Sequence, residues 1–294
     1  MADASLEALA DVLGGLPADV TAVPWGDSAS TFRVRLVDGD VLAVRRLQGP
    51  RATRRAEGLV RRAGELQRAG VPVAQPAASR IARDGSAWVV TPWIDGVTGA
   101  SVLGDPRMSL HLAEAMGRLT ARLGELDGAG LDLDDTWCDP AGLTEMRRGW
   151  LDRLRKHVQP SVVGRVRAAA ARVEAAWGTR AGWGCGVTHG DFAPINVILR
   201  PDGSIAVVDL ADLRLGPRLA DVAWWGWVVR YHHAEAWHRT WSSFVAAAGL
   251  PAGARFDELA TAFARLQVVE RAARADDPAT RTIWLSRLVE TADW

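Results

Sequence analysis

Val187-Thr188-His189-Gly190-Asp191-Phe192-Ala193-Pro194-Ile195-Asn196, followed by Ile205-Ala206-Val207-Val208-Asp209-Leu210-Ala211-Asp212, is the stretch that decides the fold. Residues 196–200 and 204–208 are rich in β-branched side chains, which favour strands. Pro201-Asp202-Gly203 between them is a turn sequence, because proline presets φ and glycine supplies positive φ. The pattern predicts a β-hairpin that brings Asn196, at its start, beside Asp209, at its end.

Asp191 precedes Asn196 by the interval that separates Asp and Asn in the catalytic loop of protein kinases. Phosphoryl transfer requires positioning, an acceptor for the hydroxyl proton and cations against the phosphate charge. We therefore expect Asp191 to orient and deprotonate a hydroxyl. Asn196 and Asp209 are the expected magnesium ligands, through oxygen. Turn preference alone explains any one such residue, but not several at the required intervals.

The pattern resembles the aminoglycoside phosphotransferase and choline kinase-like family of small-molecule kinases. That family carries an H-G-D-x-x-x-x-N loop, a hairpin that ends in Asp, and a further Asp downstream. The corresponding residues here are His189, Gly190, Asp191, Asn196, Asp209 and Asp221. The resemblance implies that His189 is structural and that Asp221 accepts backbone hydrogen bonds from the catalytic loop. It extends from about Trp25 to Trp225 and is more specific in its second half.

The resemblance implies an α+β, two-lobed protein-kinase-like fold. Residues 1–96 would form a small nucleotide-binding lobe with a mixed β-sheet and the hinge. Residues 97–294 would form a larger, mainly helical lobe that carries the chemistry and the acceptor site. The implied cofactors are ATP, with GTP as the alternative, and Mg²⁺.

A second hairpin is predicted from residues 31–37, the turn 38–40 and residues 41–45. Leu42-Ala43-Val44-Arg45 stands where a kinase carries V-A-I-K, whose lysine holds the α- and β-phosphates. Lys156 is the only lysine of the chain and belongs to the other lobe, so Arg45 is expected to take this role. Arg46 is the weaker candidate, because alternation along the strand points it to the opposite face.

Three further segments resemble parts of a nucleotide site. The helical pattern of residues 54–69 carries Glu57, and Glu65 as a second candidate, where a kinase glutamate pairs with the phosphate-binding cation; a solvated helix-face charge is the alternative. Ser28 and Ser30 lie in a loop that could cover phosphates. By resemblance alone, backbone groups near Thr91 and Trp93 would meet the adenine edge.

Composition bounds the classes of function. The chain has 294 residues, 48% of them hydrophobic and 24% charged, with a net charge of +0. Such a balance recruits neither nucleic acid nor an anionic membrane, and no stretch reaches transmembrane length. Cys138 and Cys185 are too few, and too unpatterned in spacing, to predict a disulfide framework or a metal site. We expect a cytoplasmic monomer or homodimer.

The acceptor is less well specified. Acidic residues cluster in the loop of residues 132–139 and near the end of the chain, and such carboxylates could line a pocket for a cationic acceptor or simply occupy solvated loops. Trp224, Trp227 and Tyr231 could stack on an acceptor or form a buried helix face. We expect a small-molecule O-phosphotransferase acting on an antibiotic, with an aminoglycoside first. The alternatives are a metabolic kinase for an amino alcohol or sugar, and a catalytically weak nucleotide-binding regulatory protein.

Overall fold

The computed structural model describes residues 3–23, 31–74, 78–177 and 184–294. The chain forms two compact units, and each is described by itself. The first comprises Met1–Val97 with Ile198–Ala211, and the second comprises Thr98–Val197 with Asp212–Trp294. Assigning nucleotide binding to one lobe and catalysis to the other stays a prediction.

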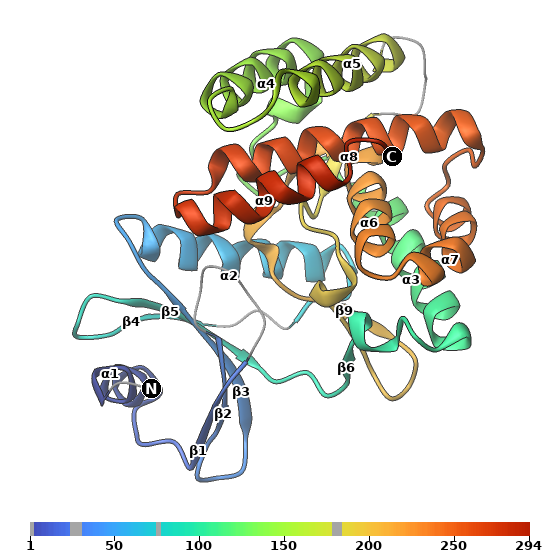
Figure 1. The fold of residues 1–294 in the computed structure, drawn as a ribbon. Coiled ribbons are helices and arrows are strands. Elements are labelled where there is room, and N and C mark those ends of the chain that lie inside the picture. Colours follow the sequence, from blue (N-terminus) through green and yellow to red (C-terminus); the bar gives the residue numbers. More distant parts are fainter. Residues whose placement is uncertain (1–2, 24–30, 75–77, 178–183) are drawn as a thin grey trace. The chain divides into compact units, whose positions relative to one another are not determined.

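An antiparallel five-stranded sheet forms the centre of the first unit, in the order β1-β2-β3-β5-β4 (Figure 1). Its strands are β1 (Asp19–Ala22), β2 (Thr31–Arg35), β3 (Val41–Leu47), β4 (Ala78–Ile81) and β5 (Ala87–Pro92). The predicted hairpin is β2 and β3, paired in a register that places Thr31 opposite Arg45. β3 is central, so its side chains alternate between two covered faces.

Two helices cover this sheet on opposite faces (Figure 1). α1 (Asp3–Leu13) buries Leu9 against Val34 and Val44. α2 (Ala52–Arg68) buries Ala56 in a second cluster, around Leu47. The helix predicted over residues 54–69 is confirmed, beginning two residues earlier than expected.

The hairpin predicted from residues 196–208 is also confirmed. Its strands are β8 (Val197–Leu199) and β9 (Ile205–Val207), in a three-stranded sheet with the order β6-β8-β9, where β6 is Val97–Thr98. The turn is closed by the Arg200 and Gly203 amides, which donate to the carbonyls of Ser204 and Arg200 at 2.9 Å each.

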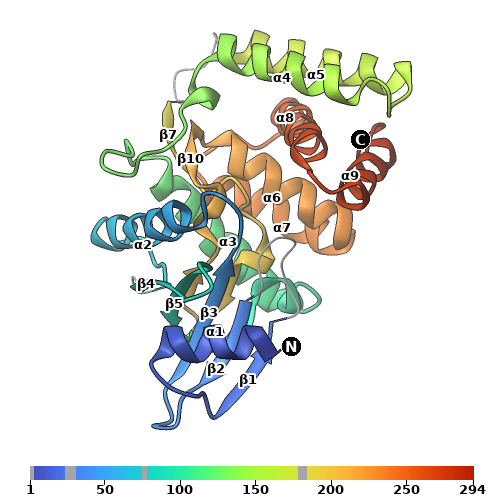
Figure 2. The ribbon, with the colours of Figure 1, turned by 90° about the vertical axis from the view of Figure 1, so that its left-hand side faces the viewer.

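The second unit is mainly helical. Its helices are α3 (Pro106–Leu123), α4 (Pro140–Leu154), α5 (Pro160–Trp177), α6 (Leu219–His232), α7 (Ala234–Ala247), α8 (Ala254–Arg274) and α9 (Pro278–Glu290). α8 lies between the α4–α5 pair and α6 in both ribbon views (Figures 1 and 2). Among the described helices, none is both long enough and apolar enough to cross a bilayer.

One short sheet interrupts these helices and leads into the candidate site. β7 (Cys185–Thr188) pairs antiparallel with β10 (Arg214–Pro217), with Thr188 opposite Arg214. The residues that follow β7 begin with His189, and those that follow β10 lead into α6. The β7–β10 pair therefore fixes where the loop that carries Asp191 starts. The α+β fold class predicted from the sequence is confirmed.

Candidate active site

A buried carboxylate anchors the start of the loop after β7, residues 189–196. Asp221, on the first turn of α6, is 1% exposed. Its two oxygens accept hydrogen bonds from the backbone amides of His189 at 2.7 Å and Gly190 at 3.0 Å. Burial raises the pKa of Asp221, while nearby His189 and the two amides act in the opposite direction. The supporting contacts expected of Asp221 are thus present in the structure.

Gly190 permits the sharp turn that this loop makes. Its φ is +77°, in the left-handed region that glycine adopts without strain. A Cβ at this position would overlap the backbone carbonyl of Asp212. The fully buried His189 accepts from the amide of Asp191 at 3.3 Å through Nδ1, which fits the structural role expected of it.

Both oxygens of Asp191 accept hydrogen bonds from fixed donors. Asn196 Nδ2 donates to Oδ2 at 2.9 Å and to the Asp191 carbonyl at 2.8 Å. Trp224 Nε1 and Arg271 Nη2 each donate to Oδ1 at 2.8 Å. The Asp191 carboxylate is therefore held in one orientation by groups of the protein itself, and its role as a general base stays a prediction.

The contacts of two of these donors, Trp224 and Arg271, with Asp191 were not predicted from the sequence. The Arg271 guanidinium lies over the Trp224 ring at 4.3 Å and also donates to the Gly190 carbonyl at 3.1 Å. Arg271 stands 80 positions from Asp191, so no local spacing reports the contact. For Trp224 the sequence suggested either stacking on an acceptor or a place on a buried helix face, and its 2% exposure agrees with the second alternative.

Asn196 is well suited to bind a cation. Its side chain is 9% exposed, and its amide nitrogen is directed at Asp191. The carbonyl oxygen Oδ1 therefore remains for a hard cation such as Mg²⁺, which prefers oxygen ligands. Asp209 belongs to the first unit, so a metal ion shared by Asn196 and Asp209 stays a prediction. Within the described residues, no group of three or more His, Cys, Asp or Glu side chains could hold a metal ion.

In the first unit, Arg45 reaches across to the end of the hairpin. Its Nη1 donates to Asp209 Oδ1 at 2.6 Å, joining residues 164 positions apart. Asp209 has φ +60°, a strained value for a residue other than glycine. Arg46 instead pairs with Asp84 at 2.9 Å and lies over the Trp88 ring. The alternation predicted for these two arginines is thus observed.

The contacts that the structure shows for the other candidates for the nucleotide site are with residues other than Arg45 and Asp209. Within the described residues, the ion pair of Arg45 is with Asp209 rather than with Glu57, which is exposed on α2, while Glu65 pairs with Arg68 at 2.6 Å. Thr91 lies opposite Ala43 in the sheet. The Trp93 amide donates to the Val41 carbonyl at 2.9 Å, so it is already engaged within the sheet. Ser28 and Ser30 lie outside the described residues.

The acidic residues considered for a cationic acceptor mostly serve other partners. Glu270, only 5% exposed, forms a buried ion pair with Arg214 through two contacts of 2.9 and 3.0 Å. Asp139 and Asp277 cap α4 and α9 by accepting from backbone amides. Glu290 accepts from Tyr231 and Ser286. These carboxylates already have counter-charges or donors within the protein.

The two cysteines correct the sequence analysis. Cys138 and Cys185 form a disulfide with a Cα–Cα distance of 5.3 Å, although their spacing predicted no pairing. They are 47 positions apart, and only the β7–β10 sheet brings the start of β7 beside the short helix of Thr136–Cys138. The bond closes a loop that contains α4 and α5.

Comparison with known proteins settles the family. The model of the phosphotransferase enzyme family matches residues 19–266, most of the chain. The chain belongs to this phosphotransferase family. The resemblance inferred from the loop and hairpin is therefore confirmed, as is the reading of the chain as a phosphotransferase. Comparison with curated protein sequences finds no significant match.

Solved structures of phosphotransferases share the fold. The macrolide 2'-phosphotransferase MphH from Brachybacterium faecium is 18% identical, with a TM-score of 0.68, over 97% of this chain and 98% of that one. The GDP and kanamycin complex of APH(2")-IIIa gives a TM-score of 0.74 at 14% identity, over 99% and 97% of the two chains. The amicoumacin kinase hAmiN, in complex with AMP-PNP and Ca²⁺, gives 0.66 at 13% identity, over 99% and 93%. At these identities the likeness concerns the fold.

Proposed function

We propose that this phosphotransferase transfers the γ-phosphoryl group of ATP, or of GTP, to a hydroxyl of a small-molecule antibiotic, with Asp191 as the general base. The observation that carries the proposal is the fixed carboxylate of Asp191, which takes hydrogen bonds from Asn196, Trp224 and Arg271. A protein that only binds nucleotide has no need of a carboxylate held in this way.

Each proposed step falls to a residue of this chain. The acceptor hydroxyl donates to Asp191, which takes its proton as the oxygen attacks the γ-phosphorus and the nucleoside diphosphate leaves. Arg45 would hold the α- and β-phosphates, once the nucleotide competes with Asp209 for its guanidinium. Asn196 and Asp209 would hold Mg²⁺, which, when bound, offsets the negative charge of the phosphates.

The side chains near Asp191, and the partners of the acidic residues, bear on the class of acceptor. Arg271, which donates to Asp191, has two aromatic neighbours. Its Cζ lies 4.3 Å from the ring centroid of Trp224 and 5.7 Å from that of Trp284. Because Trp224 is buried, of these two rings only the half-buried Trp284 could meet an acceptor, for instance the apolar face of a sugar. A polycationic aminoglycoside, the first expectation from the sequence, would need free carboxylates, and most of the candidate acidic side chains already have partners.

The test is a nucleotide-consumption screen with Mg²⁺ across macrolides, aminoglycosides, basic peptide antibiotics, choline and sugars, using ATP and GTP in parallel. We expect acceptor-dependent turnover with an antibiotic. For that acceptor, Asp191→Asn should lower kcat by at least ~100-fold while nucleotide still binds. Asn196→Ala and Asp209→Ala should each weaken Mg²⁺-dependent nucleotide binding as well as transfer.

Other outcomes would reassign the protein. Turnover with choline or a sugar alone would make it a metabolic kinase. Nucleotide binding that is independent of Mg²⁺, unchanged in both metal-site variants and unaccompanied by transfer to any acceptor, would favour a regulatory protein. Turnover by Asp191→Asn at the wild-type rate would remove Asp191 from the role of base.

A further inference from the structure

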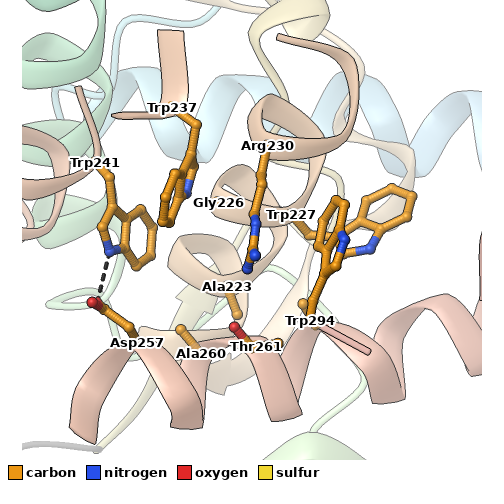
Figure 3. A pocket seen from close by; sticks show the side chains of 11 residues that line it. Ala223, Gly226, Trp227, Arg230, Trp237, Trp241, Asp257, Ala260, Thr261 and Trp294 are labelled. Atoms are coloured by element: carbon orange, nitrogen blue, oxygen red, sulfur yellow. Dashed lines mark hydrogen bonds between the residues drawn. The ribbon is translucent and has the colours of Figure 1, made fainter. Parts of the chain in front are cut away.

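A small cavity lies among α6, α7 and α8, separate from the groups that hold Asp191 (Figure 3). Its volume is ≈ 50 Å³, and its walls are largely aromatic, with Trp227, Trp237, Trp241 and Trp294 in the lining. A Cβ on Gly226 would come within 2.6 Å of the Trp241 ring, so only glycine lets this indole take its place in the wall. The position of Trp241 in the cavity wall therefore depends on the glycine at position 226.

Arg230 enters this cavity as a cation between two indoles. Figure 3 shows its side chain between Trp237 and Trp294, and its Cζ lies 5.1 and 4.4 Å from the two ring centroids. The rings cover the faces of the guanidinium and leave its N–H groups directed along its edge. Burial lowers the pKa of Arg230, because desolvation disfavours the charged form.

Comparison with similar arginines shows what Arg230 lacks. Arg271 lies over Trp224 and pairs with Asp191 at 2.8 Å. Arg214 lies over Trp137 and pairs with Glu270 at 2.9 Å. Among the described residues, Arg230 has no carboxylate within ion-pair distance. The one acidic side chain in the cavity lining, Asp257, instead accepts from Trp241 Nε1 at 2.7 Å.

Size and charge restrict what could complete this site. The cavity has about a third of the roughly 150 Å³ that accommodates benzene, so it admits a small group and not a ring. One arginine and one aspartate share the lining, and the Asp257 charge opposes a dianion such as phosphate more than a monoanion. The fork of N–H groups on a guanidinium matches the two oxygens of a carboxylate.

We propose that this cavity is an anion site that takes the carboxylate group of a small monocarboxylate, with the N–H groups of Arg230 as donors. The site does not depend on the proposed function, because none of its lining residues belongs to the proposed catalytic set. Thr261, also in the lining, carries a hydroxyl that is a further donor available to a bound oxygen.

The experiment is calorimetric titration of the full chain with propionate, with propionamide as the uncharged isostere and malonate as the dianion. We expect saturable binding of propionate at least ~10-fold tighter than that of either comparison ligand. Equal binding of propionamide, tighter binding of malonate, or no saturable binding of propionate would overturn the proposal. This comparison needs only the wild-type protein.

A variant pair assigns the binding to Arg230. Arg230→Gln should weaken propionate binding at least ~10-fold, because the charge-assisted hydrogen bonds are lost. Arg287→Gln is the matched control: its Cζ lies 4.5 Å from the Trp284 ring and 5.7 Å from the Tyr231 ring, outside the cavity lining. Unchanged affinity in a folded Arg230→Gln, or equal losses in both variants, would refute the role of Arg230.

Discussion

Arg45 is the residue at which the chain departs most clearly from the usual kinase pattern, which has a lysine there. Its guanidinium forms an ion pair with Asp209 at the end of the hairpin. We expect Arg45→Ala to raise the nucleotide KM and to lower kcat, together by ~10-fold or more, because the phosphates lose a charge-assisted partner. Arg45→Lys should retain partial activity, because a lysine ammonium keeps the charge but not the planar fork. Steady-state kinetics with varied nucleotide measure both.

Arg46 provides the matched control for this prediction. It is the next residue on β3, but it pairs with Asp84 and lies over Trp88. Arg46→Ala should therefore leave the nucleotide KM near the wild-type value. A severe nucleotide defect in Arg46→Ala combined with a wild-type Arg45→Ala would reverse the assignment of the two arginines.

Trp224 gives a second prediction at this scale, because its indole N–H is one of the donors to Asp191. Trp224→Phe keeps an aromatic ring but removes that donor. We expect kcat to fall about 10-fold, in keeping with the loss of one hydrogen bond to a charged group, with little change in the acceptor KM.

The neighbouring Trp225 serves as the control. It is also fully buried, but within the described structure its Nε1 has no hydrogen-bond partner. Trp225→Phe therefore removes no hydrogen bond and should keep kcat close to wild type at temperatures where the protein stays folded, although the smaller ring lowers stability. Equal losses of kcat in both variants would show that ring volume matters rather than the donor.

At the scale of elements, close contact between α3 and α7 depends on a glycine. A Cβ on Gly117 would come within 2.5 Å of the Phe244 carbonyl oxygen and 2.7 Å of the Ala247 Cβ. Gly117→Ala should therefore lower the free energy of unfolding by about 1–3 kcal/mol, since the helices must separate to admit the methyl group.

Gly164 in α5 tests the same substitution without the contact. A Cβ there would meet nothing within 4 Å, and the position is exposed. Gly164→Ala should raise the free energy of unfolding by up to about 1 kcal/mol, because alanine favours a helix. Denaturant unfolding of the two variants measures both signs, and destabilisation by both would contradict the packing argument.

The elements and groups that could be predicted from the sequence were those encoded by local patterns. Both hairpins and the helix α2 follow from alternation, turn residues and helical spacing. The intervals within residues 189–196, and from there to Asp209 and Asp221, likewise lie along a short length of chain. Arg271 could not be predicted in this way, because its contact with Asp191 joins residues 80 positions apart. The Cys138–Cys185 disulfide could not be predicted for the same reason, since only the tertiary pairing of strands brings the two cysteines together.

At the scale of the whole molecule, this disulfide restrains the unfolded chain as well as the folded one. A loop closed over a separation of 47 residues contributes up to about 4 kcal/mol to the free energy of unfolding in the chain-entropy model. We expect a reductant to lower the unfolding midpoint of the wild-type protein, measured in denaturant with and without it. The double variant Cys138→Ser, Cys185→Ser should already be destabilised and should not respond to the reductant. A wild-type midpoint that does not respond either would show that the bond contributes nothing to stability.

The arginine at position 45 also affects whether chemical labelling can detect this enzyme in a mixture of proteins. A nucleotide analogue that carries an amine-reactive group can label a kinase where a lysine amine meets the phosphates, whereas an arginine guanidinium stays protonated and does not react. The one lysine of the chain, Lys156, is exposed and follows α4 in the other unit. Lysine-directed nucleotide probes would therefore leave the predicted phosphate-binding strand unlabelled, and a survey based on them would count this phosphotransferase as absent.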